Sequence, residues 1–404
     1  MVIILFIGTF NQRYWVNTRH YRPGGPVIVI DGGETSGEDR LPFLDTGIAE
    51  ILAEATHGLG VVLEHRYYGE SIPVKDLSTD SLRWLNNAQS LADSAYFMRN
   101  VKFSPRLFSR SIPLSIIAKL TAPNTPWIYY GGSYAGARAA HMRILYPDIV
   151  FGAIASSAVT HATIDNWEYM DIIRTAAPDL CSSLIQTSVA EIDSLITNST
   201  LRTPLKALFG LRGLKHDDDF GAVLAWPLGY FQGKNWDPKV GNSGFDDFCA
   251  KLVDEDDIST LKSEWETAAP GLPLDLAVFR YAKYIQKLVD NLCPDVEEQE
   301  DCFGTHDATK FQGTSLQETW RLWTFQVCTE WGYFIPAPPD PNLPSMISRL
   351  INLDYEAKIC RQAFPPGKHM IVPEWPNITV VNELGDFGLT YPRLAFIDGE
   401  IDPW

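Results

Sequence analysis

The segment Trp-Ile-Tyr-Tyr-Gly-Gly-Ser-Tyr-Ala-Gly (residues 127–136) places Ser133 between an apolar run and a stretch of helix-forming residues. A nucleophilic serine at a sharp turn from strand to helix needs small residues on both sides, because larger side chains would collide there. Gly131 and Ala135 stand two positions before and two positions after Ser133. The pattern predicts a serine hydrolase nucleophile, with the backbone N–H of Tyr134 at the helix start as an oxyanion donor.

Two further segments carry residues that suit this chemistry. The chain ends in Ile-Asp-Gly-Glu-Ile-Asp-Pro-Trp, and Asp402 follows Ser133 in the order expected of the carboxylate in a catalytic triad. The glycine pair in Asp31-Gly-Gly-Glu34 predicts a loop after an earlier strand. We expect an N–H near Gly33 to be the second oxyanion donor.

The third member of such a triad is a histidine that follows the carboxylate. All histidines in the sequence precede Asp402: His20, His57, His65, His141, His161, His216, His306 and His369. We interpret them as structural or solvated histidines, including His65 after a predicted strand and His141 on the helix after Ser133. Because a serine without an imidazole has no general base, the rate would fall by several orders of magnitude. The sequence leaves two explanations, a truncated gene model and an inactive homologue, and we favour the truncated gene model.

Short apolar runs alternate with helical patterns around these residues. Runs of the length and composition of buried strands, some with a glycine turn, occupy 26–33, 60–64, 126–130, 150–157 and 392–399. Helical spacing marks residues 41–57, 82–101 and 134–146. Strands that alternate with helices in this way predict a mostly parallel sheet.

The pattern changes at about residue 160, where helical spacing becomes dominant and the cysteines begin. We predict that residues 10–160 form the first part of an α/β sheet domain and that 161–377 form a helical, disulfide-bridged insertion. Residues 378–404 would return to the sheet. We expect the C-terminal part of the sheet domain to be missing from the sequence.

Composition narrows the class of protein. The chain has 404 residues, of which 45% are hydrophobic and 21% charged, as in ordinary globular proteins. The formal net charge of −17 argues against nucleic acid or an anionic membrane surface as a partner. We interpret this charge as a contribution to solubility, with service in an acidic compartment as the sharper alternative. No stretch is long and apolar enough to span a membrane.

The cysteines and sequons point to an oxidising compartment. The six cysteines are even in number and fit three disulfide bonds. They include no Cys-x-x-Cys pair and no accompanying histidine cluster, so we expect no metal and no other cofactor. Asn198-Ser-Thr and Asn377-Ile-Thr are candidate glycosylation sites. The apolar N-terminal residues 1–8 lack the basic region and clear cleavage site of a signal peptide.

Several longer motifs resemble one known family. They are Gly-Gly-Ser-Tyr-Ala-Gly-Ala-Arg-Ala-Ala (131–140), Gly-Ala-Ile-Ala-Ser-Ser-Ala (152–158), Glu-His-Arg-Tyr-Tyr-Gly-Glu (64–70), Trp-Thr-Phe-Gln-Val-Cys-Thr-Glu (323–330) and Asp-Gly-Glu-Ile-Asp-Pro-Trp (398–404). These closely resemble the prolyl carboxypeptidase family of serine peptidases, which includes dipeptidyl peptidase II, thymus-specific serine protease and fungal acid prolyl endopeptidases. The resemblance implies an α/β-hydrolase fold with a large helical cap and cleavage of peptides next to proline. It also implies secretion, or a vacuolar or lysosome-like compartment at acidic pH.

Carried over residue by residue, the resemblance makes Ser133 the nucleophile and Asp402 the carboxylate that orients the histidine. It implies the disulfide pair Cys328–Cys360, and for the other cysteines we expect the pairs Cys181–Cys249 and Cys293–Cys302. Trp323, Trp331 and Tyr333 are candidates for a proline-binding pocket, with ordinary cap core as an equal alternative. The sequence does not decide whether the protein forms a homodimer.

The sequence leaves the type of peptidase undecided. Release of a C-terminal residue, release of an N-terminal dipeptide and internal cleavage all stay open, and Glu34 or Arg66 could contact either substrate terminus or neither. An alternative functional hypothesis is that the protein is a catalytically inactive homologue that binds peptides or partner proteins. A lipase or esterase also fits the serine turn, but the longer motifs argue against it.

Overall fold

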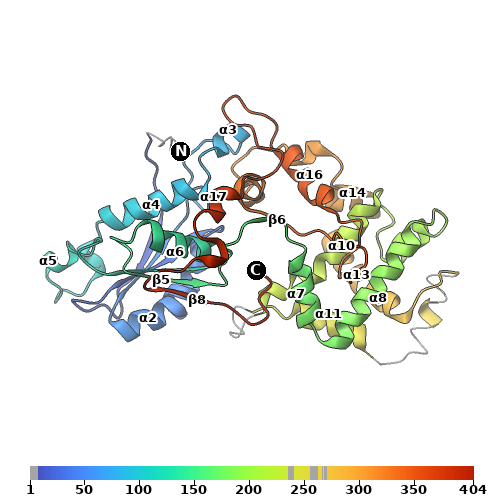
Figure 1. The fold of residues 1–404 in the computed structure, drawn as a ribbon, viewed down its shortest axis with the longest axis horizontal. Helices are drawn as coiled ribbons and strands as arrows, with labels where there is room; N and C mark the ends of the chain where they lie inside the picture. The colour runs from blue at the N-terminus through green and yellow to red at the C-terminus, as the bar shows by residue number, and fades with distance from the viewer. Residues whose placement is uncertain (1–7, 235–240, 255–262, 266, 268–270) are drawn as a thin grey trace.

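The computed structural model describes residues 8–234, 241–254, 263–265, 267 and 271–404. A sheet with its covering helices forms one lobe of the molecule, and a bundle of helices forms the other (Figure 1). The apolar N-terminal stretch lies almost wholly outside the described residues. No described helix is long and apolar enough to cross a membrane.

A six-stranded sheet forms the first lobe, in the order β1-β3-β2-β4-β5-β8. Strand β1 is antiparallel to β3, and every other neighbouring pair is parallel, so the predicted mostly parallel sheet is confirmed. β8 pairs with β5, which shows that the chain returns to the sheet after the helical region. The strands are β1 (Tyr14–Asn17), β2 (Val27–Asp31), β3 (Leu59–Leu63), β4 (Trp127–Gly132), β5 (Gly152–Ser156) and β8 (Leu394–Ile397).

Helices cover both faces of this sheet. Alternate residues of β2 point to opposite faces, so Val27 and Val29 pack with α4 and α6, whereas Ile30 packs with α1 and α2. The predicted helix 82–101 begins only at residue 87, because the Asn86 side chain caps it by accepting the N–H of Gln89. The helices of this lobe are α1 (Leu41–Asp45), α2 (Ile48–Thr56), α3 (Thr79–Leu82), α4 (Asn87–Asn100), α5 (Leu114–Ile117), α6 (Tyr134–Leu145) and α17 (Thr379–Asn382), with the 3-10 turns η1 (Gly37–Arg40), η2 (Pro105–Leu107) and η7 (Asp386–Gly388).

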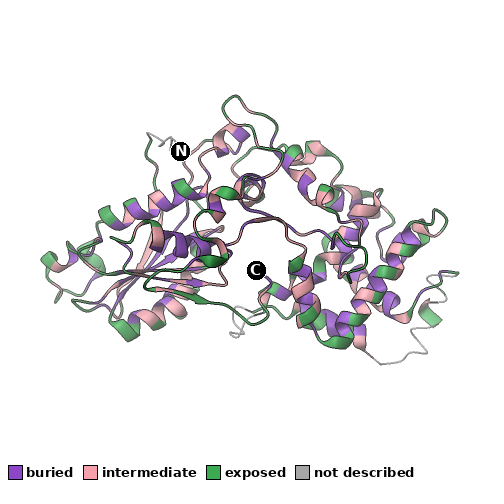
Figure 2. Cartoon of the chain, viewed as in Figure 1, coloured by how far each residue is buried: buried purple, intermediate pink, exposed green. Residues whose placement is uncertain are grey.

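The helical lobe has its own core, and Figure 2 shows its buried positions facing inward. One disulfide bond, Cys181–Cys249, joins α8 to α11, and a second, Cys293–Cys302, joins the end of α13 to α14. The elements of this lobe are α7 (Glu168–Ala176), α8 (Asp179–Ile196), α9 (Arg202–Leu208), α10 (Asp217–Gly229), η3 (Phe231–Gly233), α11 (Gly244–Val253), α13 (Leu276–Leu292), η4 (Val296–Glu298), α14 (Gln299–Phe303) and η5 (Ala308–Phe311).

A third region joins the two lobes. Here the disulfide Cys328–Cys360, the pair that the family resemblance implied, links the π-helical turn η6 to α16. The other two expected pairs are also present. This region packs on residues 67–85 of the sheet lobe, so the boundaries at 161 and 377 stay predictions. Its elements are β6 (Thr163–Asp165), α15 (Trp320–Gln326), η6 (Val327–Trp331), β7 (Gly332–Phe334) and α16 (Leu353–Ala363), and β6 pairs with β7.

Candidate active site

Ser133 lies at a strained turn between β4 and α6. Its φ of 58° is in the left-handed region that non-glycine residues seldom adopt. A Cβ at Gly131 would lie 1.9 Å from the carbonyl oxygen of Ala135, and one at Gly136 would lie 2.8 Å from that of Ser156. The small residues around Ser133 are therefore required by the close approach of backbone to backbone. Ser133 itself is partly exposed.

Neighbouring strands hold this turn in place. The N–H of Ser133 donates to the carbonyl oxygen of Ser156 at the end of β5, at 3.0 Å. Ser156 is paired in turn with Ile397 of β8. Since parallel strands end at one edge of the sheet, the segment that carries Asp402 leaves the sheet at the same edge as Ser133.

The glycine loop after β2 lies against the same turn. A Cβ at Gly33 would be 3.3 Å from the Cβ of Ala135, and Gly33 has a φ of +65°. The N–H of Gly33 donates to the Asp31 carboxylate at 2.9 Å, so its predicted oxyanion role would require this bond to be shared or exchanged. The N–H of Tyr134 belongs to the first turn of α6, where N–H groups have no partner within the helix. Both oxyanion assignments stay predictions.

Asp31 and Arg138 form a buried ion pair beneath this loop. Arg138 Nε lies 2.8 Å from Asp31 Oδ2, and both side chains are 2% exposed. The hydroxyl of Tyr129 also donates to Asp31 Oδ2. Although burial disfavours the charged guanidinium, Asp31 and the neighbouring tyrosines raise the pKa of Arg138 above its ordinary value.

Glu34 and Arg66 differ in their availability to a substrate. Burial raises the pKa of Glu34, and its Oε2 has no hydrogen-bond partner among the described residues. The Arg66 guanidinium holds the Asp93 carboxylate through two nitrogens and donates to the carbonyl oxygen of Trp84 at 2.8 Å. Arg66 thus has structural partners, whereas Glu34 Oε2 is buried without a partner among the described residues, and the contact of either residue with a substrate stays a prediction.

The three predicted pocket aromatics, Trp323, Trp331 and Tyr333, belong to a series of contacting rings that starts at Tyr134. The Tyr134 ring centroid lies 5.3 Å from that of Trp323 and 5.1 Å from that of Trp331. Tyr333 stacks on Trp331 at 6.3 Å and meets Trp404 at 5.6 Å. Trp331 is fully buried and has the contacts of a core residue, while Trp323 is partly exposed. The pocket role of these aromatics stays a prediction.

Asp402 lies in the C-terminal turn, beside the helical lobe. Its Oδ1 accepts the N–H of Trp404 at 3.1 Å, and its charge adds to burial in raising the pKa of Tyr169 on α7. No described hydrogen bond joins Asp402 to an imidazole or to Ser133. Ser133 follows β4 and Asp402 follows β8, and β5 lies between these two strands, so the pairing of the two residues in one triad stays a prediction.

The histidines near the serine turn have other partners. His65 Nε2 lies 3.0 Å from the Tyr134 hydroxyl, and His141 Nδ1 lies 3.2 Å from the amide nitrogen of Asn87. Burial lowers the pKa of both, that of His141 to about 3, with a further contribution from the Arg138 charge. Within the described residues no hydrogen bond links an imidazole to Ser133. The structural interpretation of His65 and His141 fits these contacts.

Two cavities border the C-terminal turn, and Trp404 lines both of them. One, of about 490 Å³, lies between the loop after β5 and the C-terminal segment, with Tyr333 and Asp398 in its wall. His161 also lines it, and its Nδ1 lies 2.7 Å from Asp386 Oδ1. The other, of about 640 Å³, lies between α7, α10 and the segment from 335 to 356. Sequence reasoning missed Trp404 and His161 as lining residues.

Comparison with known proteins decides the family. The profile of the family described as Serine carboxypeptidase S28 matches residues 7–404. The chain belongs to this family. Its members are serine peptidases, and the sheet order with a strained serine between β4 and α6 is that of an α/β hydrolase. The predicted family and fold class are thus confirmed.

Several S28 relatives align over almost all of the chain. A probable extracellular serine carboxypeptidase of Arthroderma benhamiae is 40% identical over 98% of this chain and 55% of its own length. The serine protease vicPa of Bipolaris victoriae is 27% identical over 99% of this chain and 75% of its own length. Mouse thymus-specific serine protease is 28% identical over 98% and 74%. The chain thus spans about half of the first relative.

Solved structures align more weakly. A proline iminopeptidase of Mycobacterium smegmatis is 11% identical and covers 67% of each chain, with a TM-score of 0.31. A marine microorganism esterase is 12% identical and covers 97% of this chain and 91% of its own, with a TM-score of 0.27. Scores of this size carry no argument, so the fold is assigned from the sheet and the family.

Proposed function

We propose that the complete protein is a serine peptidase that hydrolyses peptide bonds next to proline through an acyl-enzyme. The observation that carries the proposal is the backbone of Ser133, held at a φ of 58° between β4 and α6 by close packing of Gly131. Such strain is retained where the surrounding structure enforces it, and here it presents the hydroxyl at the exposed edge of the sheet. Membership of the S28 family supports the same activity.

In this mechanism Ser133 Oγ attacks the peptide carbonyl and its proton passes to an imidazole held by Asp402. The N–H of Tyr134 and an N–H near Gly33 stabilise the oxyanion, and the imidazole then protonates the leaving amine. Water hydrolyses the ester in the second half of the reaction. Among the described residues no hydrogen bond joins a histidine to Ser133 or to Asp402, so the proposal assigns the imidazole to none of the histidines named above.

The substrate proposal rests on the aromatic side chains around Tyr134. Proline is a flat, apolar residue, and the partly exposed Trp323 offers a matching surface 5.3 Å from the Tyr134 ring. Glu34 follows Gly33, which lies against Ala135 of the serine turn, and would contact a substrate terminus from this loop. Comparison of peptides with blocked amino or carboxyl ends would separate exopeptidase from endopeptidase action.

We propose secretion, or delivery to a vacuolar or lysosome-like compartment, for the complete protein. The three disulfide bonds suit an oxidising environment, and both Asn198 and Asn377 are exposed, as glycosylation requires. The Arthroderma relative is named extracellular.

Gel filtration of the purified protein would test whether it forms a homodimer.

The test is labelling of the complete native protein with a fluorophosphonate probe, followed by mass spectrometry of the intact chain and its peptides. We expect one adduct on Ser133, none in Ser133→Ala, and faster turnover of proline peptides than of short acyl esters. A folded protein that takes no label would overturn the proposal in favour of a non-catalytic peptide-binding homologue. Label with a preference for esters would overturn the peptidase assignment alone.

A further inference from the structure

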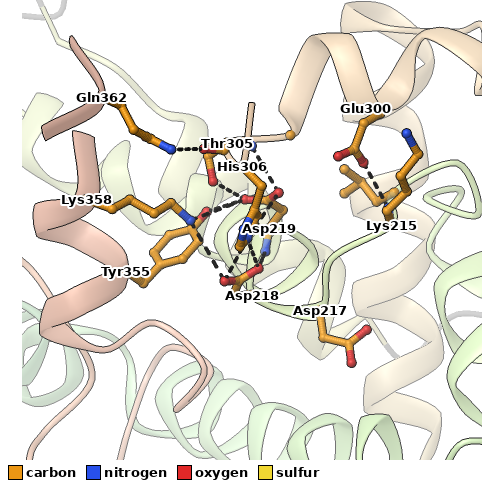
Figure 3. A network of polar contacts seen from close by, with 12 residues as sticks. Lys215, Asp217, Asp218, Asp219, Glu300, Thr305, His306, Tyr355, Lys358 and Gln362 are labelled. Carbon is orange, nitrogen blue, oxygen red and sulfur yellow. Dashed lines mark hydrogen bonds and ion pairs between the residues drawn. The ribbon is translucent and has the colours of Figure 1, made fainter. Parts of the chain in front are cut away.

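A cluster of two imidazoles and a carboxylate lies at the start of α10, in the helical lobe (Figure 3). His216, Asp218 and His306 each offer one ligand atom, and these atoms all lie within 4.8 Å of one another. His306 Nε2 is 2.9 Å and 3.0 Å from the two oxygens of Asp218. The His216 ring lies parallel to that of His306, with 3.7 Å between centroids.

A buried carboxylate holds the two segments of this cluster together. Asp219, next to Asp218, is 0% exposed and accepts the N–H of Thr305 at 3.0 Å and the Thr305 hydroxyl. The hydroxyl of Tyr355 donates to the same carboxylate at 2.9 Å. Since Thr305 precedes His306, these bonds fix the chain on both sides of the cluster. The ligand atoms are therefore held near one another before any ion binds.

The charges that face the cluster favour a cation. Asp218 and Asp219 bring two carboxylates, and Lys358 brings one ammonium, 3.8 Å from Asp218 and 4.0 Å from Asp219. Asp217 does not contribute, because it pairs with Arg202 and Lys206 and lies apart from the cluster in Figure 3. Lys358 also lies over the Tyr355 ring, 3.5 Å from its centroid. The single positive charge of Lys358 thus only partly neutralises the negative charges of Asp218 and Asp219.

We propose that His216, Asp218 and His306 bind a divalent transition-metal ion of the zinc class. Two imidazole nitrogens and one carboxylate oxygen suit Zn²⁺, whereas Mg²⁺ and Ca²⁺ prefer oxygen alone. Tetrahedral zinc, with bonds of about 2.0–2.2 Å, would require the stacked His216 and His306 rings to turn until both nitrogen lone pairs point at the ion, with water as the fourth ligand. Asp219 would act as the group that positions the ligands.

The site would stabilise the helical lobe and take no part in the reaction at Ser133. The ion would tie α10 to the segment just after the Cys293–Cys302 disulfide bond. Binding to the folded state alone raises stability by mass action. Because histidine binds metal through its neutral ring, the site would release the ion as pH falls.

The experiment is calorimetric titration of Zn²⁺ into the complete protein at pH 7.5, after treatment with EDTA. We expect one equivalent to bind, with an affinity at least tenfold lower in His306→Ala and Asp218→Asn. His20→Ala is the matched control, because His20 pairs with Glu50 in the sheet lobe. Lys358→Met should bind more tightly, since it removes the competing ammonium.

A second measurement guards against loss of folding in the variants. Co²⁺ should give visible absorption bands of a tetrahedral site in the native protein and in His20→Ala, but not in His306→Ala of unchanged circular dichroism. Absence of stoichiometric binding would overturn the proposal. So would equal affinity in His306→Ala and His20→Ala, which would leave His306 and Asp218 as a plain ion pair.

Discussion

The ion pair between Asp31 and Arg138 joins the strand that leads into the glycine loop to the helix that follows Ser133. Arg138 Nε and Asp31 Oδ2 are 2.8 Å apart, and both side chains are almost completely buried. Tyr129 and Ser94 complete the network, because the Tyr129 hydroxyl forms hydrogen bonds both to the Asp31 carboxylate and to the Ser94 hydroxyl. The pair therefore couples the predicted oxyanion loop to the nucleophile turn within one rigid unit.

Arg138→Met should strongly destabilise the protein, because it leaves the Asp31 carboxylate buried without its partner. The expected loss in the free energy of unfolding is about 3–5 kcal/mol. Arg99→Met is the control, since the Arg99–Asp148 pair is exposed and should contribute no more than about 1 kcal/mol. Urea denaturation followed by tryptophan fluorescence measures both. Equal losses of unfolding free energy in the two variants would mean that removing the buried Arg138 costs no more than removing the exposed Arg99.

Gly131→Ala should prevent formation of the serine turn, whereas Gly132→Ala should be tolerated. The new methyl group at residue 131 would lie 1.9 Å from the Ala135 carbonyl oxygen. At residue 132 the nearest atom is 3.8 Å away, which is ordinary contact. Yield of folded protein and fluorophosphonate labelling of the complete protein compare the two. Wild-type labelling of Gly131→Ala would contradict the backbone geometry described here.

Local patterns explain which parts of this structure were predictable. The strands before and after Ser133 and the helix from residue 134 follow from apolar runs and small residues within a short stretch of chain. The Asp31–Arg138 pair and the His306–Asp218 contact join residues 107 and 88 positions apart, and no local signal connects them. Cysteine spacing gave no indication of the cluster of His216, Asp218 and His306 for this reason.

Burial was the other quantity that the sequence did not reveal. Trp323 and Trp331 have the same residue type and lie in one aromatic motif, yet the first is partly exposed and the second is fully buried. The π-helical turn η6 ends at Trp331, next to Gly332 with a φ of +72°, and at this position the Trp331 ring packs against that of Tyr134. An isolated sequence pattern does not specify such a turn.

Glu330 should contribute a loss of stability as the pH rises from about 4.5 to 7. Burial raises the pKa of Glu330 from 4.5 to about 7, against the opposing effect of the Asn87 N–H. In this window the folded state keeps a proton that the unfolded state loses, so unfolding becomes easier as pH rises. The slope from this one group is at most about 1.4 kcal/mol per pH unit.

Glu330→Gln should reduce that slope and stabilise the protein at pH 7 relative to the native chain. Melting temperatures at several pH values measure the effect, and Glu383→Gln serves as the control on an exposed glutamate. Glu356, whose pKa burial also raises to about 7, should behave like Glu330 and add to it. A slope unchanged in Glu330→Gln would show that folding does not shift the pKa of this carboxyl.

Trp323→Ala should weaken the proposed recognition of proline, whereas Trp320→Ala should not. Both residues belong to α15, but Trp323 faces the Tyr134 ring and Trp320 lies beside Phe311, away from the serine turn. Loss of one aromatic contact is expected to raise KM for proline peptides about 2- to 10-fold, with little change in kcat, because the contact is equal in substrate and transition state. Steady-state kinetics of the complete protein provide the measurement. A change in both variants alike, or a fall in kcat with constant KM, would place Trp323 among the supports of α15 and remove it from the substrate pocket.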